Sequence, residues 1–172
     1  MAIAVAKFEK VTLKQFKKDW EDTFGNIPND IEEIYLNVRL PKRATAGSAG
    51  YDFYSPILIT LKPGETIKIP TGIKCKIDRD YVLKLYPRSG LGFKYRLQLN
   101  NTVGIIDSDY YGNENNEGHI MAKITNDSNE NKTVEIKAGT GFMQGIFVEF
   151  GITVDDDADG VRTGGFGSTN KR

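Results

Sequence analysis

The tripeptide Arg88-Ser89-Gly90 sets a guanidinium, a hydroxyl and a flexible backbone position directly after an alternating apolar stretch. Arg binds phosphate through paired hydrogen bonds, and successive backbone amides in a turn form a nest that holds an anion. The tripeptide is therefore a candidate phosphate site. An Arg in a surface ion pair beside an ordinary turn has the same sequence, so the segment alone leaves both interpretations open.

A single carboxylate, Asp107, follows the apolar pair Ile105-Ile106. We expect this pair to bury the backbone on one side and to restrict water around Asp107, and a carboxylate in such a place can act as a general base on a water molecule. Tyr110, three residues later, supplies an aromatic ring of the kind that packs against a sugar. The intervening Asp109 is more typical of a turn in which Asp bonds its own backbone.

The C-terminal segment 162–169 contains three glycines, together with Arg162 and Phe166. So much glycine prevents it from folding alone, but a segment that orders over a ligand has this composition, with the ring stacking on a base and the guanidinium reaching phosphate. A frayed terminus is the alternative. The acidic run 155–160 that precedes it is typical of a solvated linker.

Composition restricts what these residues can bind. The 172-residue chain has 23 Lys+Arg and 23 Asp+Glu, so no net positive charge attracts a nucleic-acid backbone or an anionic membrane. One Cys and one His cannot form a disulfide within the chain or a zinc site of the usual kind. No apolar run approaches the roughly 20 residues of a membrane span. We therefore expect a cytoplasmic protein that grips any phosphate ligand locally.

One helix and many short strands must position these groups. Leu13, Phe16, Trp20 and Phe24 recur at helical spacing, with Thr12 and Gln15 forming a capping box and Gly25 a C-cap, so a helix is predicted over Thr12–Phe24. Alternating apolar residues predict a strand over Ile34–Leu40. Further short strands are predicted at residues 57–61, 66–69, 73–77, 82–86, 97–99, 119–124, 133–136 and 142–150. This pattern favours an all-β sandwich, jelly roll or barrel.

Taken together and in order, the glycine-flanked segments resemble the motifs of the trimeric dUTP pyrophosphatases (dUTPases). The first, second, third and fifth motifs are similar to Ala49–Asp52, Arg88–Leu91, Gly104–Gly112 and Arg162–Thr169, and Gly139–Gln144 is a weaker likeness of the fourth. Several independent motifs in one order are far more specific than any single glycine pattern. The resemblance covers about Leu36 to Thr169 and leaves the N-terminal helix outside it.

The resemblance implies a jelly-roll-like β-barrel assembled as a homotrimer, which hydrolyses dUTP to dUMP and pyrophosphate. It implies that Asp107 is the catalytic base, that Tyr110 packs on the deoxyribose and that Asn101 reads the uracil edge. The other substrate-binding positions that it implies are Arg88, Ser89, Gly90, Gly104, Gln144, Arg162, Phe166, Gly167 and Ser168. It implies Mg²⁺ as cofactor, held mainly by the triphosphate, with Asp52 acting on it through water.

The expected organisation is a helical extension (1–33), a β core (34–154) and a linker with a tail that closes over the active site (155–172). Two alternatives stay open. A related dCTP deaminase would need a Glu near the base, and Glu114 and Glu117 are the nearby carboxylates of that type. A nucleotide-gated regulatory protein would use the N-terminal helix or the insertion Asn113–Glu117 to contact a protein partner. No role is predicted for His119.

Overall fold

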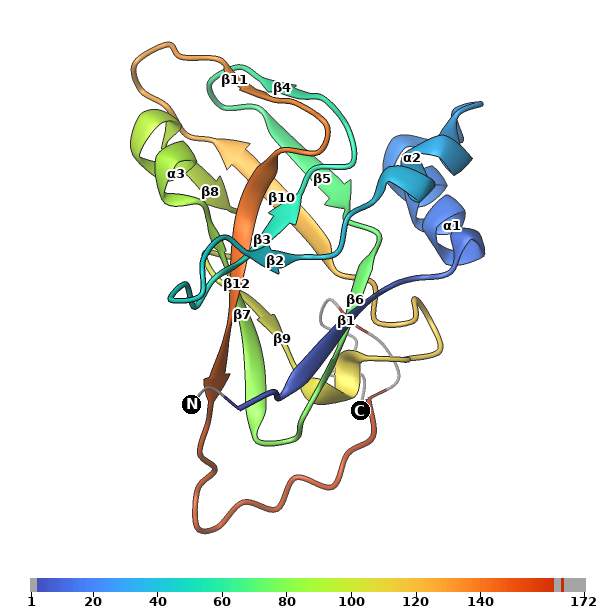
Figure 1. The fold of residues 1–172 in the computed structure, drawn as a ribbon, viewed down its shortest axis with the longest axis vertical. Coiled ribbons are helices and arrows are strands. Elements are labelled where there is room, and N and C mark those ends of the chain that lie inside the picture. The colour runs from blue at the N-terminus through green and yellow to red at the C-terminus, as the bar shows by residue number, and fades with distance from the viewer. Residues whose placement is uncertain (1–2, 163–164, 166–172) are drawn as a thin grey trace.

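A computed structural model describes residues 3–162 and Gly165, and strand pairing in it joins segments far apart in the chain (Figure 1). The largest sheet has five strands in the order β2-β3-β12-β7-β9. These strands are β2 (Lys42–Arg43), β3 (Tyr51–Tyr54), β7 (Tyr81–Pro87), β9 (Gly104–Ile106) and β12 (Gly141–Glu149). This sheet positions the second, third and fourth motifs, because all three lie on or directly after its strands.

Three smaller sheets complete the β structure. The order β5-β10-β8 makes a three-stranded sheet, and β1-β6 and β11-β4 are two-stranded pairs. Their bounds are β1 (Ala6–Lys10), β4 (Ile59–Leu61), β5 (Thr66–Pro70), β6 (Ile73–Ile77), β8 (Leu97–Leu99), β10 (Met121–Asn126) and β11 (Val134–Ile136). Every pairing is antiparallel, so alternate residues of each strand face the core.

The predicted mostly-β class is confirmed, and the eight strands predicted after residue 56 are all present within two or three residues of their expected bounds. The described strands form four separate sheets and no closed barrel. The strands β1, β2, β3 and β9 were not predicted from the sequence. The short helix α3 (Ser89–Tyr95) was not predicted either, and it stands where a turn was expected after Arg88.

The predicted N-terminal helix is confirmed as α1 (Leu13–Phe24). The Thr12 hydroxyl accepts the Gln15 amide hydrogen at 3.2 Å, and Gly25 ends the helix with φ 78°. Only half of the capping box forms, because the Gln15 side chain donates to Asp19 instead. Phe16 and Trp20 are buried, so the apolar face of α1 packs onto the body of the protein.

The strand predicted over Ile34–Leu40 is wrong, since residues Ile31–Asn37 form the helix α2. The apolar residues of this segment fit both the period of two of a strand and the period of 3.6 of a helix. Ile31 and Val38, seven residues apart on one helical face, are buried, whereas Leu36 of the alternating pattern is 74% exposed. The helical face wins because it packs on α1, where the Phe16 and Tyr35 rings lie 5.6 Å apart between centroids.

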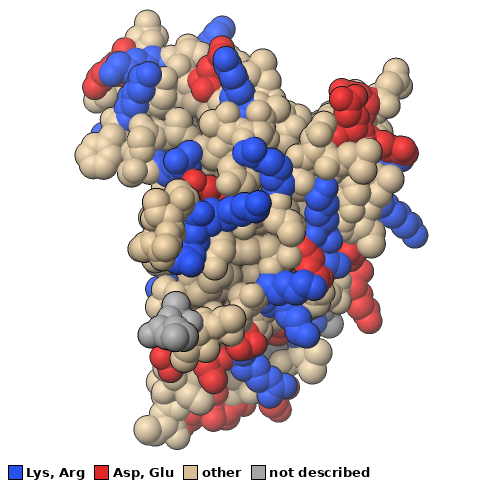
Figure 2. Space-filling view, in the orientation of Figure 1, with Lys and Arg blue, Asp and Glu red and all other residues tan. Residues whose placement is uncertain are grey.

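Helices α1 and α2 lie together at one side of the sheets, and α3 lies at the other (Figure 1). A single cluster of buried apolar side chains runs from α1 through the sheets. Positive and negative side chains are interspersed over the face in Figure 2. In the part of the chain that the structure describes, no helix is long and apolar enough to cross a membrane.

Candidate functional site

Strand β9 ends immediately before Asp107, which lines a pocket. β9 pairs with β7 through Leu83↔Ile106 and Leu85↔Gly104. Position 104 needs glycine because a Cβ there would stand 2.9 Å from the Cβ of Leu85. Directly after the strand, Asp107 is the N-cap of the 3₁₀ helix η1 (Ser108–Tyr110), and its side chain makes no capping hydrogen bond. The carboxylate is therefore free to act on something other than its own backbone.

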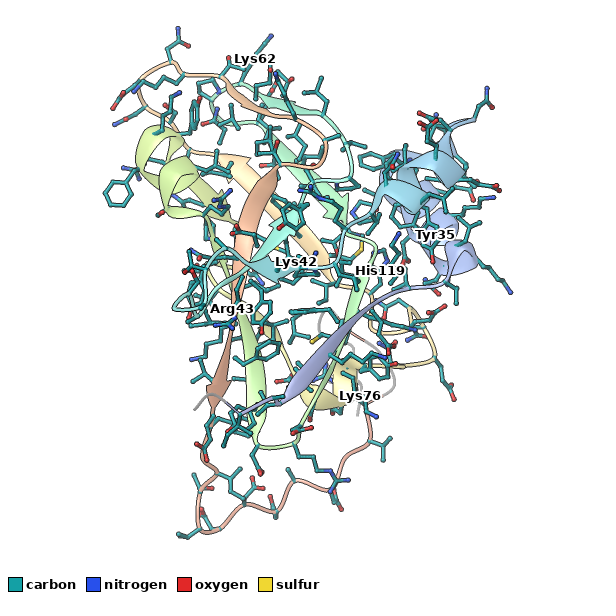
Figure 3. All side chains as sticks on the ribbon, viewed as in Figure 1. Tyr35, Lys42, Arg43, Lys62, Lys76 and His119 are labelled. Atoms are coloured by element: carbon teal, nitrogen blue, oxygen red, sulfur yellow. The ribbon has the colours of Figure 1, made fainter. Side chains whose placement is uncertain are left out.

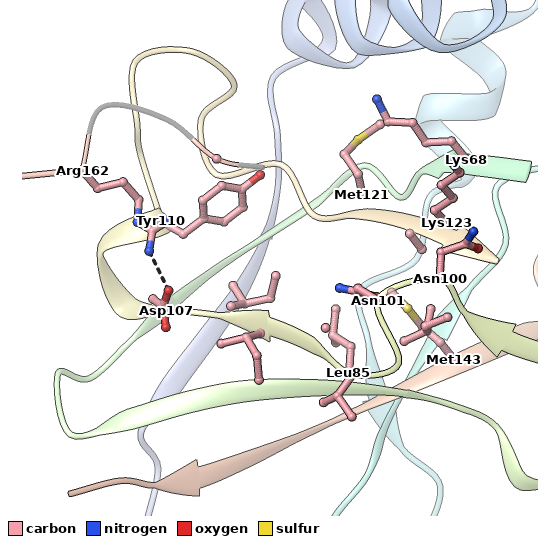
Figure 4. A pocket seen from close by; sticks show the side chains of 17 residues that line it. Lys68, Leu85, Asn100, Asn101, Asp107, Tyr110, Met121, Lys123, Met143 and Arg162 are labelled. Atoms are coloured by element: carbon pink, nitrogen blue, oxygen red, sulfur yellow. Dashed lines mark hydrogen bonds and ion pairs between the residues drawn. The ribbon is translucent and has the colours of Figure 1, made fainter. Parts of the chain in front are cut away.

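The pocket has a volume of about 530 Å³ and joins residues from six strands, β5, β7, β8, β9, β10 and β12, and from the C-terminal segment (Figure 4). Of the residues predicted from sequence, Asn101, Gly104, Asp107, Tyr110 and Arg162 line it. The other lining residues are Lys68, Leu85, Leu99, Asn100, Val103, Ile105, Ile106, Met121, Ala122, Lys123, Met143 and Gly165. The chemistry-bearing residues of the third motif thus share one cavity.

Of the apolar pair before Asp107, Ile105 is 50% exposed and lines the pocket. The alternation along β9 explains this, since Ile106 turns toward the core and Ile105 away from it. Two lysines were missed: Lys68 and Lys123 are register partners across β5 and β10, and both reach the pocket. They lie at the end of the pocket opposite Asp107 (Figure 4). No local signal marks them, because only strand pairing brings them together.

The Tyr110 ring lies on the pocket wall with 7% of the residue exposed. Its hydroxyl donates to the carbonyl of His119 at 2.8 Å and accepts from the Asn116 amide at 2.8 Å. Burial raises the pKa of the Tyr110 phenol above its ordinary value. The group therefore stays protonated, and the two hydrogen bonds hold the ring in one orientation.

Arg162 reaches the base candidate in the same chain. Its Nη2 lies 2.6 Å from Oδ2 of Asp107 and its Nε 2.7 Å from Oδ1 of Asp109. The expectation that Asp109 bonds its own backbone is therefore wrong. The guanidinium carbon lies 5.9 Å from the centroid of the Tyr110 ring. The predicted tail residues Phe166, Gly167 and Ser168 lie outside the described residues.

The remaining predicted residues gather elsewhere. Nε of Arg88 lies 3.3 Å from Oδ1 of Asp52, and Gln144 is the register partner of Asp52 across β3 and β12. The Gln144 amide also donates to the carbonyl of Pro87 at 3.4 Å. We call Asp52, Arg88, Ser89, Gly90 and Gln144 the Arg88 cluster. None of these five residues is among the described residues that line the Asp107 pocket.

The separation between the two groups follows from strand register. The pairing Leu83↔Ile106 places Asp107 beside Val82, and Arg88 lies six residues further along β7. At about 3.4 Å per residue, Asp107 and Arg88 are roughly 20 Å apart in one chain. A general base acts within one water of its target. Arg88 and Asp107 of one chain are therefore too far apart to act on the same phosphate group.

Carboxylates suited to other chemistry do not enter the pocket. Among the residues described, Glu114 and Glu117 do not line the pocket. Glu117 instead accepts hydrogen bonds from Thr12 and forms an ion pair with Lys74. No Glu is among the described residues that line the pocket. In residues 3–162 and Gly165, no three His, Cys, Asp or Glu are arranged to hold a metal ion.

The dUTPase family model matches residues 37–170. The deoxyuridine 5'-triphosphate nucleotidohydrolase of Lactococcus lactis is 42% identical over 134 residues, which are 77% of this chain and 88% of that protein. The enzyme of the same name from Paraburkholderia phytofirmans is 38% identical over 147 residues, covering 82% of this chain and 95% of that one.

Solved structures agree. The dUTPase of Streptococcus mutans superposes with a TM-score of 0.63 at 36% identity, covering 85% of this chain and 97% of that chain. The dUTPase of the Staphylococcus aureus phage phi11, at 24% identity and a TM-score of 0.57, shares the fold. Because the family model covers most of the chain and these relatives are matched over most of their own length, the chain belongs to the dUTPase family, the dUTP diphosphatases.

Proposed function

We propose that this enzyme hydrolyses dUTP to dUMP and pyrophosphate, with Asp107 as the general base for the water that attacks the α-phosphorus. The observation that carries the proposal is that Asp107, Tyr110 and Asn101 line one pocket. Oδ2 of Asp107 is paired with Arg162, which leaves Oδ1 to accept a proton from water. Such a reaction lowers the dUTP pool and supplies dUMP for dTTP synthesis.

The pocket has the parts needed to read a deoxyribonucleoside. Asn101 offers an amide for the uracil edge in the turn between β8 and β9, and the small Gly104 lets the nucleotide approach the backbone. The nearly buried Tyr110 ring presents a flat wall to the sugar. A wall fixed by two hydrogen bonds excludes a ribose 2′-hydroxyl by its position, because it cannot withdraw to make room.

The phosphate-binding parts come from a neighbouring chain in this proposal. Arg88 lies about 20 Å from Asp107 within one chain, and the first turn of α3 leaves the N–H groups of Ser89 and Gly90 without helical acceptors. We propose a homotrimer in which the Arg88 cluster of one subunit faces the Asp107 pocket of another. The catalytic base of one subunit and the phosphate-binding residues and Gln144 of the next would then contact the same triphosphate. Positioning and charge neutralisation are the main requirements of phosphoryl chemistry.

Asp52 is the residue suited to Mg²⁺. Mg²⁺ takes oxygen ligands and is usually bound by one or two carboxylates together with substrate phosphates and water. One partly buried carboxylate beside Arg88 is too few protein ligands to hold Mg²⁺ alone, and it fits an ion carried in by the nucleotide. When bound, the ion neutralises charge on the phosphate oxygens.

The tail closes the site in this proposal. Arg162 already lies against Asp107 and beside the Tyr110 ring, where a nucleotide phosphate would compete for its guanidinium. Phe166 would stack on the base, and Gly167 and Ser168 would approach the phosphates.

The test is a pyrophosphate-release assay on the purified protein with dUTP, dCTP, dTTP, dATP, dGTP and UTP. We expect turnover of dUTP far above that of every other nucleotide. Conversion of dCTP to dUTP without pyrophosphate release would replace the proposal with a deaminase. Tight dUTP binding without turnover would replace it with a regulatory binding protein.

A further inference from the structure

His119, for which no role was predicted, is completely buried and connects helix α1 to the sheets (Figure 3). Its Nδ1 lies 2.5 Å from Oδ2 of Asp19 on α1, and its Nε2 accepts the backbone N–H of Gly72 at 2.7 Å. An Nε2 that accepts a hydrogen bond carries no proton, so the ring is neutral and Nδ1–H donates to Asp19. The Gly72 N–H therefore sets the tautomer, and Asp19 of the helix holds the imidazole in its orientation.

A second connection lies at the start of the same helix. Glu117 accepts hydrogen bonds from the backbone N–H of Thr12 at 3.1 Å and from its hydroxyl at 2.5 Å. Lys74 pairs with the same carboxylate at 3.0 Å. Burial alone would raise the pKa of Glu117, but the hydrogen bonds from Thr12 and Lys74 outweigh it and lower the pKa below its ordinary value. The carboxylate thus caps α1 from 105 residues away.

Both connections from α1 end on the segment 113–119, which forms hydrogen bonds with Tyr110. The His119 carbonyl accepts from the Tyr110 hydroxyl, and the Asn116 amide donates to the same hydroxyl. The Asn113 amide donates to the Tyr110 carbonyl at 2.8 Å and to the side chain of Asn116 at 2.7 Å. Gly118 has φ +82°, and a Cβ there would lie 2.6 Å from the Tyr110 carbonyl oxygen. The segment therefore fits closely around Tyr110.

We propose that helix α1 is a positioning element of the active site, in which Asp19 acts through His119 to fix the Tyr110 ring and so sets the preference for dUTP over UTP. The inference rests on the proposed function of Tyr110 as the sugar-facing residue. The connection from α1 to Tyr110 passes through one residue. The Asp19 carboxylate binds the His119 imidazole, and the backbone carbonyl of His119 accepts the hydrogen bond from the Tyr110 hydroxyl. A ring held at both its hydroxyl and its backbone excludes the 2′-hydroxyl, whereas a ring that can shift admits it.

The experiment compares Asp19→Ala with Asp19→Asn and with the control Asp22→Ala in the full-length protein. Asp22 is an exposed Asp on the same helix, so its replacement makes the same charge change. Asn offers an amide oxygen that can still accept from Nδ1–H. We expect Asp19→Ala to lower the ratio of kcat/KM for dUTP to that for UTP about tenfold. Asp19→Asn should restore most of it, and Asp22→Ala should leave it unchanged.

A double-mutant cycle separates positioning from stability. Tyr110→Phe keeps the ring but removes both hydroxyl hydrogen bonds, so we expect it to lower the same ratio and the double variant Asp19→Ala/Tyr110→Phe to be no worse than either single variant. Additive losses would overturn the inference. So would an unchanged ratio in Asp19→Ala with only a lower thermal midpoint, which would make α1 a stabilising element alone.

Tyr110→Ala separates a failure of the proposed role of Tyr110 from a failure of its coupling to α1. If it leaves the dUTP preference intact, the proposed role of Tyr110 fails, and the inference fails with it. If Tyr110→Ala abolishes the preference but Asp19→Ala retains it, the role of Tyr110 stands and the coupling to α1 is refuted.

Discussion

Replacing Asp107 with Asn removes a proton acceptor and leaves almost every other contact of the residue in place. The side chain makes no capping hydrogen bond to η1, and the amide oxygen of Asn can still accept from Arg162, which lies 2.6 Å from the carboxylate. The Asp107 side chain is 47% exposed. An ion pair of such exposure contributes about 0–1 kcal/mol, so we expect the free energy of unfolding to change by less than about 1 kcal/mol.

Catalysis should respond far more strongly than stability. A positioned general base contributes typically about 10²–10⁴-fold to the rate, which corresponds to roughly 2.7–5.4 kcal/mol of activation free energy. The assay is pyrophosphate release under saturating dUTP, with nucleotide affinity measured by calorimetry on the same variant. We expect kcat to fall by that factor and the dissociation constant for dUTP to stay nearly unchanged.

Asp109→Asn is the matched control, because Asp109 shares the Arg162 partner at 2.7 Å but does not line the pocket. It should retain kcat within about threefold, the effect of a weakened surface ion pair. The reasoning is refuted if Asp107→Asn keeps near-normal turnover, or if the two variants lose turnover equally. Loss of dUTP binding in Asp107→Asn would instead assign Asp107 to the structure of the site.

Four further outcomes are expected. Phe16 is fully buried, so Phe16→Ala should lower the free energy of unfolding by about 3–5 kcal/mol in urea denaturation, and a change below about 1 kcal/mol would contradict the packing of α1. Because folding lowers the pKa of Glu117 from 4.5, its stabilising contribution is present above that value and is lost as the pH falls through the folded-state pKa; Glu117→Gln should therefore flatten the dependence of stability on pH in this acidic range. Burial raises the pKa of Cys75 to about 12, so iodoacetamide should modify the native protein far more slowly than the urea-unfolded chain, and equal rates would place the thiol at the surface. Finally, Arg88→Ala and Asp107→Asn should each be nearly inactive yet regain activity when refolded together, and failure to do so in mixed trimers confirmed by mass would rule out a shared site.

Local patterns were sufficient for the elements whose signals do not compete. Helix α1 carries its own start and stop in Thr12 and Gly25, and its apolar face fits one period only. The strands after residue 56 alternate between turns that interrupt them. The order of the motifs likewise needs no structure, so the dUTPase family follows from the sequence itself.

Where two local patterns compete, only packing decides between them. The segment Ile31–Val38 fits a strand and a helix equally well by period, and burial of Ile31 and Val38 against the body of the protein, with Leu36 left exposed, selects the helix. The choice depends on which face a distant part of the chain covers, and no short window of sequence contains that information.

The site required the tertiary structure for the same reason. Glu117, not Gln15, completes the cap of α1, and the imidazole of His119 gains its partner from Asp19, 100 residues earlier. Hydrogen bonds between residues so far apart leave no periodic trace in the sequence. Individual residue types show that a base, a ring and a guanidinium are present; strand register decides that Asp107 and Arg88 stand at opposite ends of β7.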